Sequence, residues 1–332
     1  MIQSPGVIIM STVFVQILLL LLFIFIGYIL ASSGKADKSH SKLLSVLGYY
    51  IFLPANVFKT FSNNFTVEYL TQKYPLILIS AVFVIIMFLA GIPISRSLSK
   101  NPYHQSIYRY SLISSNYGYV GYTLAQALFG DLGLLNVMMF AVPLSIYTYS
   151  IGYCSLTKNK LSLKKLMGPV NIALVAGALV GLARPYVVQF FTTYAAGFVE
   201  FVTPVGQPLL KLINSFLDKS QGAMGPISML LTGMVISEYN IKDILGQRSV
   251  YIMAALRLIL IPCGFCGLML LLGLKEFVTP VLIMLALPCG LNTIVFPKLI
   301  GEDCKPGAAL ACVTSVLCCF TIPLCLWLFG IY

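Results

Sequence analysis

The sequence has few charged residues. Only 9% of its 332 residues are Asp, Glu, Lys or Arg, whereas 59% are hydrophobic. Soluble domains usually carry about 25% charged residues, so this composition excludes an ordinary soluble protein. A bilayer is the solvent that suits such a chain, and each helix that crosses it needs about 20 apolar residues. The chain therefore has room for about ten spans with short connections.

Groups that could do chemistry are also scarce. The long apolar runs contain no Asp or Glu, and the two histidines, His40 and His104, lie between the runs. A membrane hydrolase or transferase needs a nucleophile with a base, or metal ligands, and the runs offer neither. The nine cysteines lie mostly inside apolar runs, where they act as small hydrophobic residues. We therefore expect no enzymatic activity, no catalytic residue, no metal and no cofactor.

Basic residues outnumber acidic ones, which gives a net charge of +11. A protein that binds nucleic acid gathers its Lys and Arg residues in one stripe or patch. Here they are spread over short loops, where they fit the rule that cytoplasmic loops of membrane proteins are rich in Lys and Arg. We expect the lipid bilayer, and no nucleic acid, as a partner.

Ten charge-poor runs predict membrane helices. They cover residues 8–31, 43–61, 74–98, 107–129, 132–154, 170–190, 220–237, 249–272, 278–300 and 308–331. Five charges lie among apolar residues of the segment 184–219, which leaves an eleventh span open, but we interpret this segment as an interfacial connection. They are Arg184, Glu200, Lys211, Asp218 and Lys219.

The basic residues predict an orientation. The connections after helices 1, 3, 5, 7 and 9 hold 14 Lys and Arg residues, and the connections after helices 2, 4, 6 and 8 hold six. The first set is therefore predicted to be cytoplasmic, with both termini on the other side. An eleventh span would move the basic loop of Lys242 and Arg248 outside, which favours ten. We expect a multi-pass protein of the cell membrane.

Two halves of five helices each, residues 1–154 and 155–332, would have opposite topology because five is an odd number. Two pairs of segments support a repeat. SVLGYYIFLPANVF in helix 2 resembles QGAMGPISMLLTGMVI in helix 7, and AQALFGD at the end of helix 4 resembles FPKLIGED at the end of helix 9. The sequence thus predicts an all-α membrane protein made of two inverted five-helix repeats.

Helices 4 and 9 are interrupted at matching places. Helix 4 contains SSNYGYVGYT (114–123) and helix 9 contains LPCGLNT (287–293). Pro288 removes a backbone donor, and Gly290 weakens the helix further. Opened backbone at this depth must face protein or water, and paired breaks in transporters point to the substrate site. The candidate residues are Ser115, Asn116, Gly118, Gly121, Thr123, Pro288, Gly290, Asn292 and Thr293.

Three further polar residues are candidates for the substrate site. Asn56 in helix 2 and Thr232 in helix 7 would form a facing wall, or they would only serve hydrogen bonds between helices. Arg257 is the one charge well inside a predicted span, at a cost of about 2.5 to 3.5 kcal/mol without a partner. Its guanidinium either reaches the interface or caps a helix, or it serves as a counter-charge for an anion or for the broken helices.

Several of these segments resemble the auxin efflux carrier family. NYGYVGYTLAQALFGD is similar to the family's helix 4, GPVNIALVAGALVGL to its helix 6, GPISMLLTGMVIS to its helix 7, RLILIP to its helix 8 and LPCGLNTIVFPKLIGED to its helix 9. The resemblance implies the ten-helix fold of bile-acid sodium symporters, in which helices 4 and 9 cross at their breaks. Helices 1, 2, 6 and 7 would form a scaffold domain, through which a homodimer would assemble. Helices 3–5 and 8–10 would form a mobile transport domain.

Two features depart from the family. Thr123 replaces the helix 4 proline, so the first break is expected to depend on Gly118 and Gly121, and the connection before helix 7 is longer than usual. The long cytoplasmic loop of plant members is absent, as in bacterial members that resemble carriers of small carboxylates.

The resulting hypothesis is a secondary transporter of small organic anions with an elevator mechanism. The candidate coupling ions are H⁺ and Na⁺, and the sequence does not choose between them. One alternative is a sodium-coupled symporter of larger amphipathic anions such as bile acids. Another, of a different class, is a ligand sensor built on a transporter fold.

Overall fold

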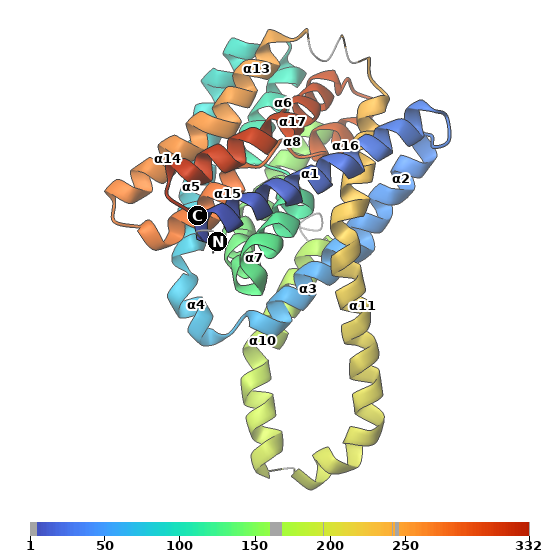
Figure 1. Ribbon diagram of the computed structural model, residues 1–332, viewed down its shortest axis with the longest axis vertical. Coiled ribbons are helices and arrows are strands. Elements are labelled where there is room, and N and C mark those ends of the chain that lie inside the picture. The colour runs from blue at the N-terminus through green and yellow to red at the C-terminus, as the bar shows by residue number, and fades with distance from the viewer. Residues whose placement is uncertain (1–4, 160–167, 195, 241, 243–245, 332) are drawn as a thin grey trace.

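The structure is a computed structural model that describes residues 5–159, 168–194, 196–240, 242 and 246–331. In this part of the chain the regular structure is helical throughout, with no strand, so the predicted all-helical fold is confirmed (Figure 1). The α-helices are α1 (Pro5–Ser32), α2 (Lys38–Leu47), α3 (Leu53–Asn64), α4 (Val67–Lys73), α5 (Pro75–Leu98), α6 (Pro102–Ile113), α7 (Tyr122–Tyr147), α8 (Tyr153–Thr157), α10 (Pro169–Tyr194), α11 (Ala196–Ser237), α13 (Arg248–Ala255), α14 (Ile261–Leu271), α15 (Val278–Ala286), α16 (Asn292–Leu299) and α17 (Lys305–Leu328).

Four π-helical turns join several of these helices into longer rods. They are η1 (Gly48–Phe52), η2 (Tyr117–Gly121), η3 (Thr148–Gly152) and η4 (Leu256–Leu260), and η5 (Lys275–Phe277) is a short 3₁₀ helix. Single π turns inside α-helices often mark functional sites. Here η2 contains Gly118 and Gly121 of the predicted first break, and η4 contains Arg257, so two of the turns carry candidate site residues.

Six helices of the described residues are long and apolar enough to cross a membrane. They are Ser39–Asn64, Pro75–Leu98, Tyr122–Thr157, Pro169–Phe191, Arg248–Leu271 and Lys305–Leu328. Within the span Tyr122–Thr157, Gly130 has a left-handed backbone (φ 65°), and a kink there separates the predicted helices 4 and 5. The protein is therefore a membrane protein with several spans. The number of ten spans stays a prediction.

Polar residues between the apolar runs start the helices. Asp37 caps α2 by accepting hydrogen bonds from the backbone amides of Ser39 and His40. Hydrogen bonds from Ser39 hold the pKa of the Asp37 carboxyl well below its usual range. Asn101 caps α6 in the same way, through the amides of Tyr103 and His104. These caps lie in two of the connections that the Lys and Arg counts predict to be cytoplasmic.

Glycines allow four helices to pack closely. A Cβ atom on Gly27 of α1 would overlap the carbonyl of Leu230 in α11, and one on Gly233 of α11 would overlap the carbonyl of Ile24. Likewise, a Cβ on Gly181 of α10 would lie 2.5 Å from the carbonyl oxygen of Phe61 in α3. Small residues that let backbones approach are typical of helix pairs in membranes. The lack of a side chain at these glycines thus lets α1 pack closely against α11, and α3 against α10.

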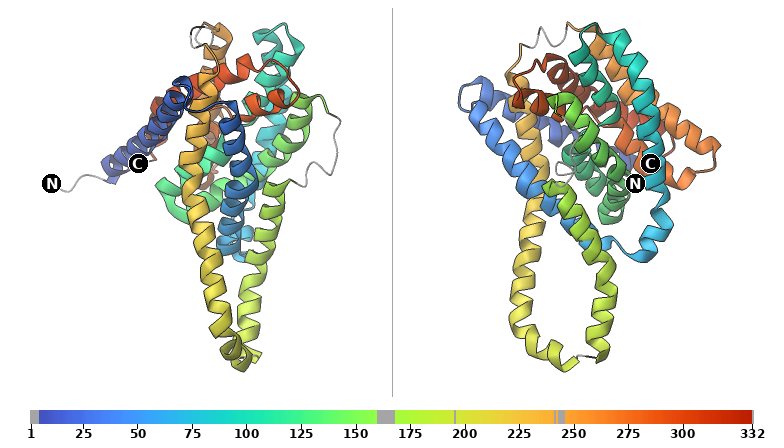
Figure 2. Two further views of the ribbon diagram at one scale, coloured as in Figure 1. Left: turned by 90° about the vertical axis from the view of Figure 1, so that its right-hand side faces the viewer. Right: turned by 180° about the vertical axis from the view of Figure 1, so that it is seen from behind.

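The interpretation of residues 184–219 as an interfacial connection is wrong. In the described residues, α10 continues to Tyr194 and α11 begins at Ala196, so both helices run through this segment. They leave the other helices and project as a hairpin at the bottom of Figure 1, which the two views of Figure 2 also show. At the rise of an α-helix, the 42 residues of α11 follow a path of about 63 Å, which bends near the start of the helix at the tip of the hairpin (Figure 1).

The charges in this segment mark where the hairpin leaves the bundle. Lys59 of α3 forms an ion pair of 2.7 Å with Asp218 of α11. On the other side, Arg184 of α10 donates a hydrogen bond of 3.4 Å to the Asn63 side chain at the end of α3. Two of the five charges that suggested an interface, Arg184 and Asp218, are therefore at the base of the hairpin, and the helices continue beyond them.

Ion pairs join loops that the orientation rule places on the same side. Lys73, the last residue of α4, lies 3.1 Å from Glu276 in η5, and both belong to the predicted non-cytoplasmic set. His104 lies 3.1 Å from Asp303, and Lys158 pairs with Glu302; these residues belong to the predicted cytoplasmic set. These pairs agree with the predicted alternation of the loops between two sides.

Candidate functional site

The two predicted breaks meet inside the protein. Ser115 and Cys289 form an isolated antiparallel β bridge, and the backbone amide of Asn116 donates a hydrogen bond of 2.9 Å to the Pro288 carbonyl. A Cβ atom on Gly290 would lie 3.2 Å from the Ser115 carbonyl oxygen, so glycine permits this close approach. We call residues 114–121 and 287–293 the crossover. The structure thus brings together segments that are more than 160 residues apart in the sequence.

The break in helix 9 is confirmed where Pro288 and Gly290 predicted it. Helix α15 ends at Ala286, Leu287 has extended backbone (φ −67°, ψ 153°), and α16 begins at Asn292. The Cys289 amide, which has no helical acceptor, donates to the Thr314 hydroxyl of α17 at 2.9 Å. The opened backbone is therefore satisfied by protein, as its depth requires.

The break in helix 4 lies earlier than the glycines predicted. The chain leaves α6 at Ser114 and has extended backbone there, whereas Gly118 and Gly121 belong to the π turn η2. Gly121 has a packing role instead, because a Cβ atom there would lie 2.5 Å from Leu287 Cδ1. The expectation that these two glycines make the break is thus wrong, and the residues that open the helix are Ser114, Ser115 and Asn116.

Buried polar side chains surround the crossover. Asn292 Nδ2 donates to the Tyr110 hydroxyl at 3.0 Å, and Thr293 Oγ1 donates to the Gly290 carbonyl at 2.8 Å. The Ser114 hydroxyl lies 2.7 Å from that of Thr148, in the π turn η3. The Asn116 residue is 4% exposed, and the buried Ser115 hydroxyl has no hydrogen-bond partner among the described residues. At least one polar group at the crossover therefore lacks an internal partner.

The sequence missed Tyr110, Thr148 and Thr314. Tyr110 is one turn before the break, which is a signal that could have been used. Thr148 and Thr314 lie on predicted helices 5 and 10 with no local feature that sets them apart, so only the fold reveals their roles.

The facing-wall residues are buried on neighbouring helices. Asn56 in α3 is 2% exposed, and its side-chain oxygen has no partner among the described residues. Thr232 in α11 donates to the Ser228 carbonyl of its own helix at 2.8 Å. No hydrogen bond between described residues joins either of them to the crossover. Thr123, in contrast, contacts the wall, because a Cβ on Gly225 of α11 would lie 2.9 Å from its methyl group.

Arg257 is fully buried in η4 and lies behind the crossover. Its Nη1 donates a hydrogen bond of 2.7 Å to the carbonyl of Leu112, in the last turn of α6. The guanidinium therefore does not reach the interface; it caps the half-helix that ends at the first break. Of the interpretations left open by the sequence, helix capping and a counter-charge for the broken helix both agree with this contact.

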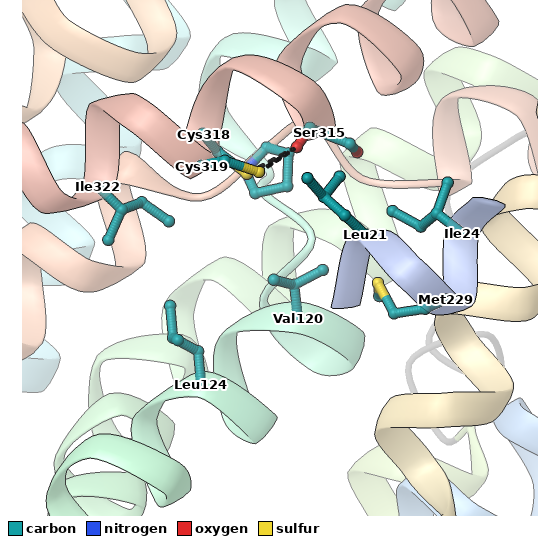
Figure 3. Close-up of a pocket in the computed structure, with 10 residues that line it drawn as sticks. Leu21, Ile24, Val120, Leu124, Met229, Ser315, Cys318, Cys319 and Ile322 are labelled. Atoms are coloured by element: carbon teal, nitrogen blue, oxygen red, sulfur yellow. Dashed lines mark hydrogen bonds between the residues drawn. The ribbon is translucent and has the colours of Figure 1, made fainter. Parts of the chain in front are cut away.

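A narrow cleft, with a cavity of about 20 Å³, reaches the crossover (Figure 3). It lies between α1 and α11 on one side and η2, α7 and α17 on the other. Its lining is mostly apolar and includes Pro288 of the second break. The lining residues are Leu21, Ile24, Val120, Leu124, Met229, Pro288, Ser315, Cys318, Cys319 and Ile322. A molecule in this cleft would therefore touch both segments of the crossover, at Val120 and at Pro288.

Known proteins resemble this chain over most of its length. The family model described as membrane transport protein matches residues 12–175 and 154–326. The chain is also similar to an uncharacterized transporter of Methanocaldococcus jannaschii, with 24% identity over 322 residues that cover 94% of this chain and 97% of the relative. The two matches of the family model overlap over residues 154–175.

Proposed function

The chain belongs to the membrane transport protein family, the family of the auxin efflux carriers, and we propose that it carries a small organic anion such as a carboxylate. The observation that carries the proposal is the meeting of two broken helices beside a cleft. Broken helices near the middle of the membrane form the substrate sites of many secondary transporters. The substrate and the mechanism are our inference, whereas transport follows from the family.

The electrostatics of the crossover favour an anion. The half-helix that begins at Tyr117 points its first amides toward the first break, and the first amides of a helix have no acceptor within the helix. At the start of α16, the amides of Thr293 and Ile294 already donate to the carbonyls of Gly290 and Leu291, so this half-helix acts mainly through its dipole. The positive end of the helix dipole attracts negative charge. The buried side-chain amide of Asn116 adds a further donor. The predicted spans contain no Asp or Glu that would repel an anion.

The lining of the cleft suggests a substrate with an apolar part. Sites for small molecules usually have volumes of about 300 to 1,000 Å³, whereas this cavity has about 20 Å³, so the proposed movement of the transport domain must widen it before an anion enters. Side chains such as Leu21 and Met229 would contact the apolar part, while the crossover would bind the charged group. The same apolar lining supports the alternative of a sodium-coupled symporter of amphipathic anions, which a dependence of uptake on sodium would identify.

An elevator mechanism is proposed from the packing of the helices. Helices α1, α2–α3, α10 and α11 correspond to the expected scaffold, and α1–α11 and α3–α10 are closely packed through glycines. The cleft separates α1 and α11 from α7 and α17 of the expected transport domain. A shift of the transport domain along the scaffold would carry the crossover across the membrane. Ten spans in two inverted repeats and a homodimer through the scaffold are parts of the same proposal.

The first test replaces Asn116 by Ala. Purified protein in proteoliposomes is offered a panel of labelled small carboxylates under proton, sodium or voltage gradients. We expect saturable uptake by the intact protein and none by Asn116→Ala, because a donor at the crossover is lost. Asn240→Ala, at an exposed position after α11, is the matched control and should transport normally.

The control for folding is the amount of each variant that inserts and purifies as a monodisperse protein. Undiminished uptake by correctly inserted Asn116→Ala would refute the assignment of the site. Binding of a carboxylate without flux through the intact protein would instead identify a sensor built on a transporter fold.

A further inference from the structure

Arg257 places a permanent positive charge where a half-helix ends. Its side chain is 0% exposed, and it lies in the π turn η4 of the helix Arg248–Leu271. Its Nη1 donates to the Leu112 carbonyl, while Nε and Nη2 have no hydrogen-bond partner among the described residues. Leu112 is the residue before Ile113, the last residue of α6, so its carbonyl has no helical donor. The guanidinium is thus bound to one freed carbonyl of the first break.

The end of a half-helix is a site that attracts cations. The last carbonyls of a helix have no internal donor, and the helix dipole adds about half a negative charge there. In transporters with broken helices, these carbonyl ends coordinate the coupling ions. In the described part of this chain, no group of three His, Cys, Asp or Glu side chains could hold a metal ion. A coupling cation at the end of α6 would therefore depend on backbone carbonyls and hydroxyls.

A sodium ion and Arg257 would compete for the same carbonyl. Two unit charges about 4 Å apart repel by about 4 kcal/mol in surroundings of intermediate polarity. No carboxylate in the predicted spans would offset this repulsion. The end of α6 thus has room for one positive charge, and the Arg257 guanidinium already provides that charge.

We propose that Arg257 is a resident cation that replaces a coupling sodium ion at the C-terminal end of α6. Transport of the anion is therefore independent of sodium, and the charge that stabilises the first break is always present. Arg257 acts as a positioning residue, because it binds the Leu112 carbonyl, two residues before the crossover, and does not line the cleft. The proposal rests on the proposed transport function only for its statement about coupling; the cation site itself can be tested without transport.

The experiment measures thermal unfolding of the purified protein in detergent, in sodium chloride and in choline chloride of equal concentration. We expect the Tm of the intact protein to be the same in both salts. Arg257→Ala, which removes the guanidinium and leaves the carbonyl free, should have a lower Tm in choline chloride and a saturable rise in Tm with sodium. The readout does not require flux, so a failure of the uptake assay leaves it valid.

Two variants serve as controls. Arg257→Lys keeps a cation at the site and should unfold at the same Tm in both salts, whereas Arg248→Gln, an exposed position at the start of the same helix, should behave as the intact protein. Where Arg257→Ala does not purify as a folded protein, Arg257→Gln takes its place. A specific effect of sodium on the Tm of the intact protein, or none on either neutral variant, would overturn the proposal.

Discussion

Asn292 depends on one phenol for its orientation. Its amide donates to the Tyr110 hydroxyl at 3.0 Å, and Tyr110 is buried in α6, on the other side of the crossover. The hydrogen bond thus links the start of α16 to the half-helix that precedes the first break. An amide held in this way presents a fixed pattern of donors to a bound anion, which lowers the entropy cost of binding.

Tyr110→Phe removes that acceptor while keeping the ring. A hydrogen bond of this kind contributes about 1 kcal/mol, so we expect KM for the anion to rise by about fivefold, with little change in the maximal rate. The measurement is the concentration dependence of initial uptake in proteoliposomes. Tyr186→Phe, at an exposed tyrosine of the projecting part of α10, is the control and should leave KM unchanged. An unaltered KM in Tyr110→Phe would show that Asn292 does not take part in binding.

Sequence and structure agree at residues whose chemistry acts locally. Pro288 lacks a backbone donor wherever it is placed, and together with Gly290 it predicted a broken helix. Proline alone does not break a helix here, because Pro93, Pro143 and Pro323 lie inside continuous helices. The partner of a broken helix is not local. Ser115 and Cys289 pair only because two distant helices cross, and Thr314 accepts from Cys289 only because α17 packs behind them. For that reason, the sequence predicted one break well and placed the other several residues too late.

At the scale of helices, close packing depends on the absence of side chains. Gly27 and Gly233 lie on α1 and α11, and each faces a backbone carbonyl of the other helix. In a bilayer, hydrophobic burial does not drive two helices together, so van der Waals contact between their backbones is a main source of stability. The helices therefore cannot separate to admit a methyl group without losing these contacts.

Gly233→Ala should destabilise the protein by about 1 to 3 kcal/mol, because its Cβ would overlap the Ile24 carbonyl and force α1 away from α11. The measurement is the Tm of the purified protein in detergent. Gly264→Ala is the matched control, because Gly264 lies in α14 with nothing within 4 Å of a new Cβ. That variant should be neutral or slightly more stable, since alanine favours a helix over glycine. Equal stability of the two variants would mean that the α1–α11 contact is not tight.

The hairpin of α10 and α11 shows where hydropathy misleads. A charge at the edge of an apolar run usually marks the end of a helix at the interface. Here Arg184 and Asp218 do mark the level at which the chain leaves the bundle, but they bind α3 and the helices continue. The far part, which includes Leu212 at 67% exposure, has apolar residues that no local rule distinguishes from those of a span. Only the contacts with α3 separate the two parts.

For the whole molecule, the proposed mechanism requires one group of helices to move past another. One close contact across the proposed boundary joins Thr123 of α7 with Gly225 of α11. A Cβ on Gly225 would lie 3.7 Å from the Cβ of Thr123. Disulfides have Cβ to Cβ distances of about 3.5 to 4.5 Å, so a cysteine pair at these two positions has suitable spacing.

The double variant Thr123→Cys/Gly225→Cys therefore tests whether the two groups move. We expect mild oxidation to form the disulfide and to abolish uptake, because a covalent bond holds the crossover at one level relative to α11. Dithiothreitol should restore the uptake of the same protein, which separates the effect of the bond from that of the substitutions. The intact chain and each single variant, treated with the same oxidant, report what the nine native cysteines contribute. Uptake that continues after mass spectrometry has shown the bond would mean that the anion crosses without sliding at this contact, as in a mechanism where only the cleft opens and closes.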